Sequence, residues 1–164
     1  DGASGFGNGR LIPAGPLREP VAAAAARCRA AVLIGEDRAG ARALLPPDLP
    51  VLRARLVQRE VEPLVGCRAF AFAGIGLPDK FFAGLRAAGV DLAGTWAFPD
   101  HHPYTAAEIA EVHARAQALG AVPVTTPKDA ARLALEQHAG MQVVGVALAW
   151  EDEAALAALL AELE

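Results

Sequence analysis

The sequence predicts an α/β fold in which a mainly parallel sheet carries helices on both faces. From residue 69 onward, short apolar runs of strand type alternate with longer stretches of helical type. This alternation is typical of βαβ units. The composition agrees, because 54% of the 164 residues are hydrophobic and 21% are charged, as in a globular protein with a substantial core.

The first part of the chain predicts a helix, a strand and a second helix. The alanine-rich run predicts a helix over 21–29, a short apolar run predicts a strand over 31–34, and a helix is expected over 36–45. Residues 51–60 alternate apolar and polar, which predicts a half-exposed strand, and another strand follows at 67–73. These last two strands form either a hairpin or a linker between lobes.

The remainder predicts strands and helices in strict alternation. In an open parallel sheet, ligands bind at the edge where the carboxyl ends of the strands lie. The loops at Gly74, Asp100 and Thr126 follow successive strands, so we expect them to line one rim. The expected strands cover 69–73, 92–97, 122–125 and 142–150, and the expected helices cover 79–88, 106–119, 129–136 and 152–163.

Charge and cysteine content exclude several classes of function. The formal net charge of −4 gives no global attraction for nucleic acid, so an anion must be held by local groups. Cys28 and Cys67 match neither a disulfide framework nor a metal spacing, and we expect both to be small buried hydrophobes in a reducing compartment. No membrane span or signal peptide is predicted, and no metal site.

The segment GFGNGRLIPAGPLRE (5–19) predicts a cradle for a polyanion. Gly5, Gly7 and Gly9 can adopt positive φ and present backbone N–H groups to a ligand. Arg18 lies just before the expected helix, where helix dipoles and a guanidinium both favour phosphate. The alternative is an ordinary glycine-rich connection followed by a helix.

The segment FPDHHPYT carries the best candidate for chemistry. Histidine titrates near neutrality, so one exposed at the rim could take a proton from a hydroxyl. His101 and His102 point opposite ways in extended backbone, and we choose His101 as the general base and expect His102 to pack or lie at the surface. Asp100 is a poor orienter for His101 by the same geometry.

Two predicted capping boxes flank this loop and the next. Thr105 with Glu108, and Thr126 with Asp129, have the spacing of helix N-caps, which makes these residues structural. The capping box does not explain Lys128. A lysine in the first turn of a helix interacts unfavourably with the helix dipole unless a bound anion offsets its charge. The chain contains no P-loop motif, and its glycines near residue 74 lack the third glycine of a dinucleotide fingerprint.

These segments together resemble the tetraacyldisaccharide 4′-kinase family, the lipid A 4′-kinases of Gram-negative bacteria. They occur in the family's order and correspond to about the last half of a family member. The chain also starts with Asp1 inside a glycine-rich loop, as a piece of a longer polypeptide would. The segments are GFGNGRLIPAGPLRE, FAGIGLPDKFF, FPDHHPYT and VTTPKDAARL.

The resemblance implies phosphoryl transfer from ATP, with Mg²⁺, to the 4′-hydroxyl of a tetraacyldisaccharide 1-phosphate, giving lipid IVA. It assigns general-base catalysis to His101 and phosphate stabilisation to Arg18. It places the P-loop and the Mg²⁺-associated acidic residues in the other half of the family's sequence, so we expect this fragment to be inactive alone. The implied location is the cytoplasmic face of the inner membrane, as a peripheral protein. The candidate substrate- and phosphate-binding residues are Gly7, Asn8, Gly9, Arg18, Glu19 and Lys128.

The predicted organisation has three parts. Residues 1–50 form the end of the P-loop kinase lobe, 51–68 a β linker, and 69–164 the C-terminal α/β lobe. Two alternatives for function remain: a metal-dependent phosphoesterase that uses Asp100, His101 and His102 as ligands, and a non-catalytic lobe that binds a glycolipid phosphate.

Overall fold

The computed structural model describes residues 1–162 and divides the chain into two compact units. The second unit comprises Val57–Ala147, and the first comprises Asp1–Leu56 together with the chain from Leu148 onward. The predicted C-terminal lobe over 69–164 therefore differs from the observed division, because its last residues belong to the first unit. Sequence patterns do not reveal this return, since they carry no information on which sheet a distant strand joins.

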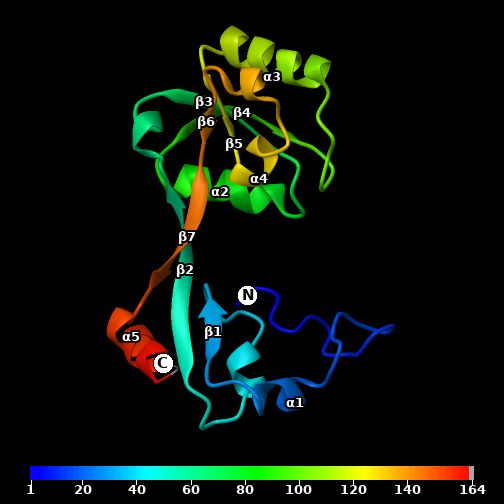
Figure 1. Ribbon diagram of the computed structural model, residues 1–164, viewed down its shortest axis with the longest axis vertical. Coiled ribbons are helices and arrows are strands. Elements are labelled where there is room, and N and C mark those ends of the chain that lie inside the picture. Colours follow the sequence, from blue (N-terminus) through cyan, green and yellow to red (C-terminus); the bar gives the residue numbers. More distant parts are fainter. Residues whose placement is uncertain (163–164) are drawn as a thin grey trace. The chain divides into compact units, whose positions relative to one another are not determined.

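The first unit contains a sheet with strand order β1-β2-β7 (Figure 1). Strands β1 (Ala31–Ile34) and β2 (Val51–Arg59) pair in parallel, with Ala31 opposite Val51. Strand β7 spans Gly145–Trp150, and both β2 and β7 continue from one unit into the other. The helices of this unit are α1 (Val21–Ala25), the 3₁₀ helix Ala41–Leu44 and α5 (Glu153–Ala161).

The second unit contains a sheet with strand order β4-β3-β5-β6, in which every adjacent pair is parallel. This confirms the predicted α/β class and its mainly parallel sheet. The strands are β3 (Arg68–Ala73), β4 (Asp91–Ala97), β5 (Val122–Thr125) and β6 (Gln142–Val143), and the helices are α2 (Pro78–Ala87), α3 (Ala106–Ala118), α4 (Pro127–Ala130) and the 3₁₀ turns Glu62–Leu64 and Leu135–His138.

Alternating residues of β3 build two cores, one on each face of this sheet. Ala69, Ala71 and Ala73 pack with Phe81, Phe82 and Leu85 of α2, whereas Phe70 and Phe72 pack with Ile109, Val112 and Ala116 of α3. Helices α2 and α3 consequently lie on opposite faces of the strands (Figure 1). Small alanines on one face and phenylalanines on the other let both helices approach a strand that is almost completely buried.

The structure has no hairpin between the strands predicted at 51–60 and 67–73, because β2 and β3 belong to different sheets. The strand predicted over 142–150 is divided in the same way. β6 pairs with β5, whereas β7 belongs to the sheet of β1 and β2. The break falls at Val144, which is buried and donates its N–H to the Thr125 carbonyl.

The helix predicted over 36–45 is reduced to the 3₁₀ helix Ala41–Leu44, because the side chain of Asp37 and the left-handed Gly40 redirect the backbone. In the 36–45 segment, the Asp37 carboxylate accepts the N–H groups of Ala41 and Arg42, and Gly40 is left-handed with φ 67°. These backbone hydrogen bonds, the one from Arg42 foremost, lower the pKa of Asp37.

The helix predicted over 129–136 ends at Ala130. There Arg132 and Leu133 donate to carbonyls three residues back, which tightens the turn. The helix predicted over 21–29 ends at Ala25, and the end of the helix predicted over 152–163 lies outside the described residues.

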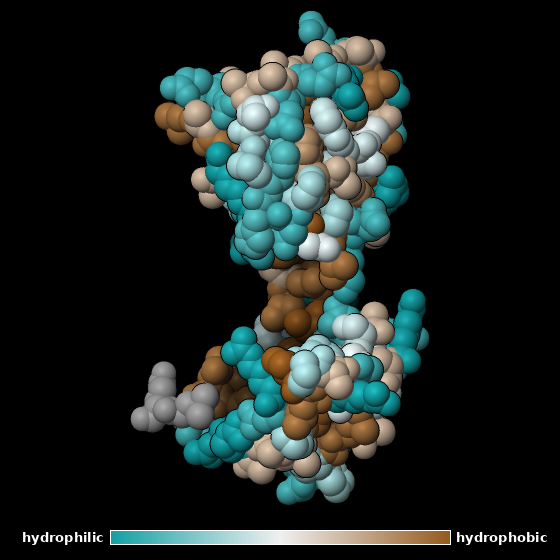
Figure 2. Space-filling model, turned by 90° about the vertical axis from the view of Figure 1, so that its right-hand side faces the viewer, coloured by the Kyte–Doolittle hydropathy of each residue, from teal (hydrophilic) through white to brown (hydrophobic). Residues whose placement is uncertain are grey.

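Both units expose hydrophilic and hydrophobic residues on the face shown in Figure 2. Among the exposed large hydrophobic residues, Leu11 belongs to the first unit and Leu135 to the second. Helix α5 has no buried residue, and Leu160 on it is exposed. Cys28 and Cys67 are also exposed, so the prediction of buried cysteines is wrong. Within residues 1–162, none of the helices has the length and hydropathy needed to cross a bilayer.

Candidate functional site

Three loops meet at the carboxyl edge of the parallel sheet in the second unit. The N–H of His101, after β4, donates to the carbonyl of Gly74, after β3, at 3.0 Å. The N–H of Gly74 in turn donates to Oδ1 of Asp129, in the loop and helix after β5, at 3.1 Å. The expectation that the loops at Gly74, Asp100 and Thr126 line one rim is confirmed by these bonds.

The carboxylate of Asp129 is the centre of this arrangement. It is completely buried, and its Oδ1 accepts hydrogen bonds from the Gly74 N–H, the Tyr104 hydroxyl (3.0 Å) and Nη1 of Arg132 (3.2 Å). Its Oδ2 accepts the hydroxyl of Thr126 at 2.7 Å. A buried carboxylate is stable only with such partners. Donors from three loops therefore all bind the carboxylate of Asp129.

Tyr104 remains a hydrogen-bond donor over the whole physiological pH range. Its burial, together with the neighbouring charge of Asp129, raises the pKa of its hydroxyl far above the usual value. Its ring also packs edge-on against Phe72, with the ring centroids 5.6 Å apart. The loop after β4 is thereby attached both to the core and to Asp129.

His101 is the exposed imidazole of the rim. Its backbone has φ 59°, a left-handed conformation that non-glycine residues seldom adopt, and its side chain is 80% exposed. Nη2 of Arg132 lies 3.1 Å from its Nδ1, and Oδ2 of Asp100 lies 3.8 Å from its Nε2. The ring is accessible to a ligand and has a cation on one side and a carboxylate on the other.

His102 packs inside the loop, as expected. Its ring stacks on Phe98 with a centroid distance of 4.9 Å, and its Nε2 lies 2.9 Å from Oε1 of Glu108. The capping box of Thr105 and Glu108 is confirmed at the start of α3. The backbone N–H of Thr105, then its hydroxyl and then His102 lower the pKa of Glu108. His102 therefore links the loop to the helix that follows it.

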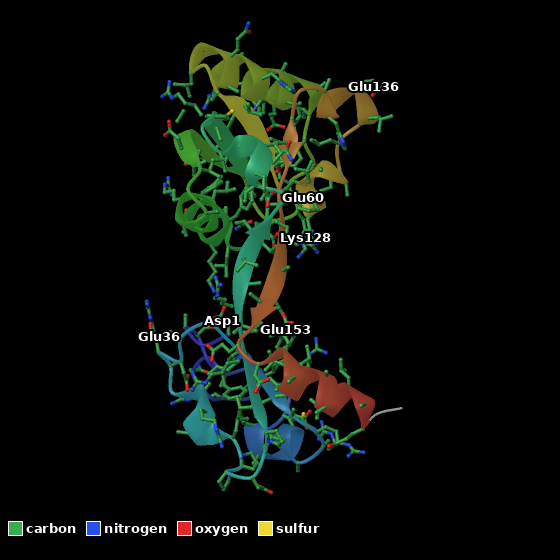
Figure 3. All side chains as sticks on the ribbon, turned by 90° about the vertical axis from the view of Figure 1, so that its left-hand side faces the viewer. Asp1, Glu36, Glu60, Lys128, Glu136 and Glu153 are labelled. Atoms are coloured by element: carbon green, nitrogen blue, oxygen red, sulfur yellow. The ribbon has the colours of Figure 1, made fainter. Side chains whose placement is uncertain are left out.

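The Thr126 cap is also confirmed, because its hydroxyl accepts the N–H of Asp129 at 3.2 Å. Lys128 lies exposed in the first turn of α4 (Figure 3). That helix has four residues, so its dipole supplies little attraction for an anion.

The glycine-rich segment of the first unit adopts the expected left-handed conformations. Gly5, Gly7 and Gly9 have φ of 54°, 65° and 70°. Their N–H groups, however, donate to carbonyls of the same segment, those of Asp1, Ser4 and Phe6. In this conformation the three glycine amides stabilise consecutive turns and are not offered to a ligand.

Asn8 holds this segment closed. Its Nδ2 donates to the carbonyl of Ala14 at 2.9 Å, and its Oδ1 accepts the N–H of Arg10 at 3.1 Å. The bond to Ala14 closes the loop formed by residues 8–14.

Arg18 and Glu19 differ in their surroundings. Arg18 is exposed, whereas Glu19 forms a two-bond ion pair with Arg27 at 2.6 and 2.8 Å. The hydrogen bonds from Arg27 lower the pKa of Glu19. The exposed guanidinium of Arg18 is therefore accessible to an anionic ligand, whereas the guanidinium of Arg27 is paired with Glu19.

The predicted site residues fall into two groups. His101 and Lys128 belong to the second unit, whereas Gly7, Asn8, Gly9, Arg18 and Glu19 belong to the first. The contacts of Tyr104 and Arg132 were not predicted from the sequence, and Asp129 was predicted only as a capping residue. The one signal for Asp129 was its place in the predicted cap of Thr126, in a loop expected at the rim.

Residues 1–162 contain no group of three or more His, Cys, Asp or Glu side chains placed to hold a metal ion. The alternative that uses Asp100, His101 and His102 as ligands lacks support, because His102 is engaged with Phe98 and Glu108. The donor set of the described residues likewise does not fit a Mg²⁺ ion held by this chain alone.

Comparison with known proteins identifies the family. The family model described as tetraacyldisaccharide-1-P 4′-kinase matches residues 1–164. This chain belongs to that family. It is 56% identical over 161 residues to the tetraacyldisaccharide 4′-kinase of Gluconacetobacter diazotrophicus, which covers 98% of this chain and 49% of the relative. The corresponding enzyme of Rhodospirillum centenum is 52% identical over 165 residues, covering 99% of this chain and 49% of the relative.

The chain spans about half the length of the 4′-kinases it matches. The fold also agrees with a solved structure, the "apo" form of LpxK from Aquifex aeolicus in complex with ATP. The TM-score is 0.60 at 23% identity, over 93% of this chain and 48% of that one. The sequence similarity shows the family, and the structural similarity shows the fold.

The close packing at Gly74 generates a first prediction. A Cβ at this position would lie 2.8 Å from the Tyr104 hydroxyl and 3.1 Å from the Pro99 carbonyl. Gly74→Ala should therefore displace the loop after β4 and lower the free energy of unfolding by roughly 1–3 kcal/mol, measured by urea unfolding. Gly76→Ala is the matched control, because its Cβ would make only an ordinary contact, 3.4 Å from Asp100. Equal stability of the two variants would contradict this account.

Asp129→Asn should destabilise the second unit. The amide has the shape of the carboxylate but cannot accept all four donors, and it leaves Arg132 without its charge partner. An unsatisfied buried group costs roughly 1–3 kcal/mol, which urea unfolding can detect. The exposed Asp100→Asn should change the unfolding midpoint little. A wild-type midpoint for Asp129→Asn would show that the charge does not hold the loops.

Proposed function

We propose that this chain is the C-terminal part of an enzyme that transfers a phosphoryl group from ATP to the 4′-hydroxyl of a tetraacyldisaccharide 1-phosphate, giving lipid IVA. The observation that carries the proposal is the family match over residues 1–164, together with high identity to named tetraacyldisaccharide 4′-kinases. The rim of the second unit supports it, because an exposed imidazole stands there on loops fixed by Asp129.

The proposed roles follow from what phosphoryl transfer demands of a protein. Catalysis is mainly positioning and stabilisation of charge on the transferred group, with a residue that orients the attacking hydroxyl. His101 takes the second role and contacts the reacting oxygen atoms. The role predicted for it from the sequence is that of a general base. Arg18 takes the first, because an exposed guanidinium can bind phosphate oxygens through two parallel hydrogen bonds.

The remaining binding candidates have unequal support. Lys128 is exposed and cationic, which suits a phosphate. Glu19 acts through Arg27, whose guanidinium it holds. Gly7, Asn8 and Gly9 shape the segment that precedes Arg18, and they contribute to binding by fixing that segment.

The proposed cofactors are ATP and Mg²⁺. Mg²⁺, when bound, neutralises charge on the phosphate oxygens. Residues 1–162 contain no acidic cluster for it, and the sequence contains no P-loop, so the proposal places both binding functions mainly outside this chain.

The proposed location is the cytoplasmic face of the inner membrane, with peripheral attachment. A tetraacylated substrate remains in a bilayer because each buried methylene adds to its membrane affinity. The enzyme must therefore reach the sugar at the membrane surface. The net charge of −4 argues against nucleic acid as a partner.

The test of the proposal is an assay of the complete protein that carries this chain. It is incubated with tetraacyldisaccharide 1-phosphate in mixed micelles and γ-labelled ATP, and the 4′-phosphorylated product is identified by chromatography. We expect label in that product. Phosphate release from the lipid without any need for ATP would instead indicate a phosphoesterase, and substrate binding without turnover a non-catalytic lobe.

In the same assay, His101→Ala should lower kcat by roughly 10²–10⁴, the usual contribution of a group positioned at the reacting atoms. The control is His113→Ala on α3, whose ring lies 3.4 Å from the Gln137 carbonyl and away from the rim. Turnover of His101→Ala at the wild-type rate would remove His101 from the mechanism.

Arg18→Ala should lower kcat/KM for ATP by roughly 10- to 100-fold, because a charge-assisted bond to phosphate contributes about 1.5–3 kcal/mol. Arg18→Lys should recover only part of this loss, since an ammonium cannot bind two oxygens in the same way. The control is Arg29→Ala, another exposed arginine of the first unit. Equal kinetics for the Arg18 and Arg29 variants would refute a specific phosphate contact.

A further inference from the structure

The contact between Arg132 and His101 favours one tautomer of the neutral imidazole. Nη2 of Arg132 lies 3.1 Å from Nδ1 of His101. A guanidinium has only donors, so this hydrogen bond exists only when Nδ1 is unprotonated and accepts. A neutral imidazole with a free Nδ1 carries its proton on Nε2.

The other side of the ring favours the same tautomer. Oδ2 of Asp100 lies 3.8 Å from Nε2 of His101, beyond hydrogen-bond length but close enough for attraction. A carboxylate stabilises an N–H that faces it, and a guanidinium stabilises an unprotonated nitrogen. Each of the two neighbours of His101 therefore favours a proton on Nε2.

Arg132 is held in place by bonds that do not involve His101. Its Nη1 donates to the Gly74 carbonyl at 3.0 Å and to Oδ1 of Asp129 at 3.2 Å, and its side chain is only 25% exposed. Because the planar guanidinium is already fixed by these two acceptors, its second nitrogen meets His101 with little further loss of side-chain freedom. In functional histidines, the hydrogen bond made by one ring nitrogen commonly sets which nitrogen carries the proton, and Arg132 supplies such a bond here.

We propose that Arg132 is a positioning residue that holds the neutral ring of His101 in the tautomer with its proton on Nε2, so that His101 meets the substrate as a hydrogen-bond donor. This rests on the proposed function and replaces the general-base role that the sequence analysis gave to His101. With Nδ1 engaged by Arg132 and Nε2 already protonated, neither ring nitrogen is free to accept a proton from a hydroxyl. The exposed Nε2–H instead suits an oxygen that gains negative charge, either of the phosphoryl group or of the reacting hydroxyl.

The experiment measures the tautomer directly. The complete protein is labelled with ¹⁵N-histidine, and the ring nitrogens are observed by NMR at about pH 8, where an ordinary imidazole is neutral. The signals of His101 are assigned by their loss in His101→Ala. We expect Nδ1 of His101 to have the shift of an unprotonated nitrogen and Nε2 that of a protonated one.

Arg132→Met should remove this preference and give the averaged shifts of an imidazole that exchanges between tautomers. Arg132→Lys should retain part of it, because an ammonium can still donate but lacks the planar fork that reaches Gly74, Asp129 and His101 from separate nitrogen atoms. Turnover should fall by up to about 10²-fold in Arg132→Met, as expected when a reacting group is misplaced.

Tyr104→Phe is the matched control. It also removes one hydrogen bond from Oδ1 of Asp129 but leaves the contact of Arg132 with His101 in place. If Arg132 only stabilised the loop, both variants would alter the ring signals alike. We expect the tautomer to change in Arg132→Met and to persist in Tyr104→Phe.

Two results would overturn the inference: a protonated Nδ1 in the wild-type protein, or an unchanged tautomer in Arg132→Met. Failure of the proposed function looks different, because it appears in the kinase assay as the absence of labelled product. The NMR result does not depend on turnover, so each idea can fail without the other.

Discussion

One buried carboxylate determines the geometry of the rim. Asp129 is completely enclosed, and its oxygens receive donors from the loop after β3, the loop after β4 and the segment after β5. In a low-dielectric interior, a charge that lost these partners would be very costly, so the three loops are constrained to move together. The positions of Gly74, Tyr104 and Arg132 all follow from this requirement, and the exposed ring of His101 inherits its orientation from two of them.

The two groups of candidate residues illustrate different ways of preparing a site. His101 stands on a backbone with positive φ, which persists because Gly74 accepts its N–H and the surrounding loop is anchored. The glycine-rich segment has instead turned its amides inward and closed on itself through Asn8. The first site is anchored by hydrogen bonds and exposes a side chain. The second offers the guanidinium of Arg18 from a segment whose own backbone is satisfied.

Local patterns predicted the fold class and most strands, because alternation and apolar runs depend on neighbours along the chain. They predicted the caps at Thr105 and Thr126 for the same reason, and the packing of His102. The extended backbone assumed for His101 and His102 is wrong, because His101 is left-handed with φ 59°. Local patterns failed where the deciding partner is remote: the split at Val144 depends on which sheet each half joins, and the roles of Tyr104 and Arg132 depend on Asp129 and Gly74. The short helix near Asp37 shows a third limit, since a carboxylate that binds backbone N–H groups competes with helix formation.

The division of the chain also has a consequence for synthesis. Val57–Ala147 is one uninterrupted stretch, so the second unit has all its residues as soon as Ala147 has left the ribosome. The first unit takes in the chain from Leu148 onward and shares β7 in its sheet, so it stays incomplete until translation has passed the whole intervening stretch. Since domains generally fold as they emerge, the later of the two units in sequence is the earlier to finish. A nascent chain that stalls once Ala147 has emerged would contain every residue of the second unit, while β2 would still lack part of its partner strand β7 and expose an unpaired sheet edge.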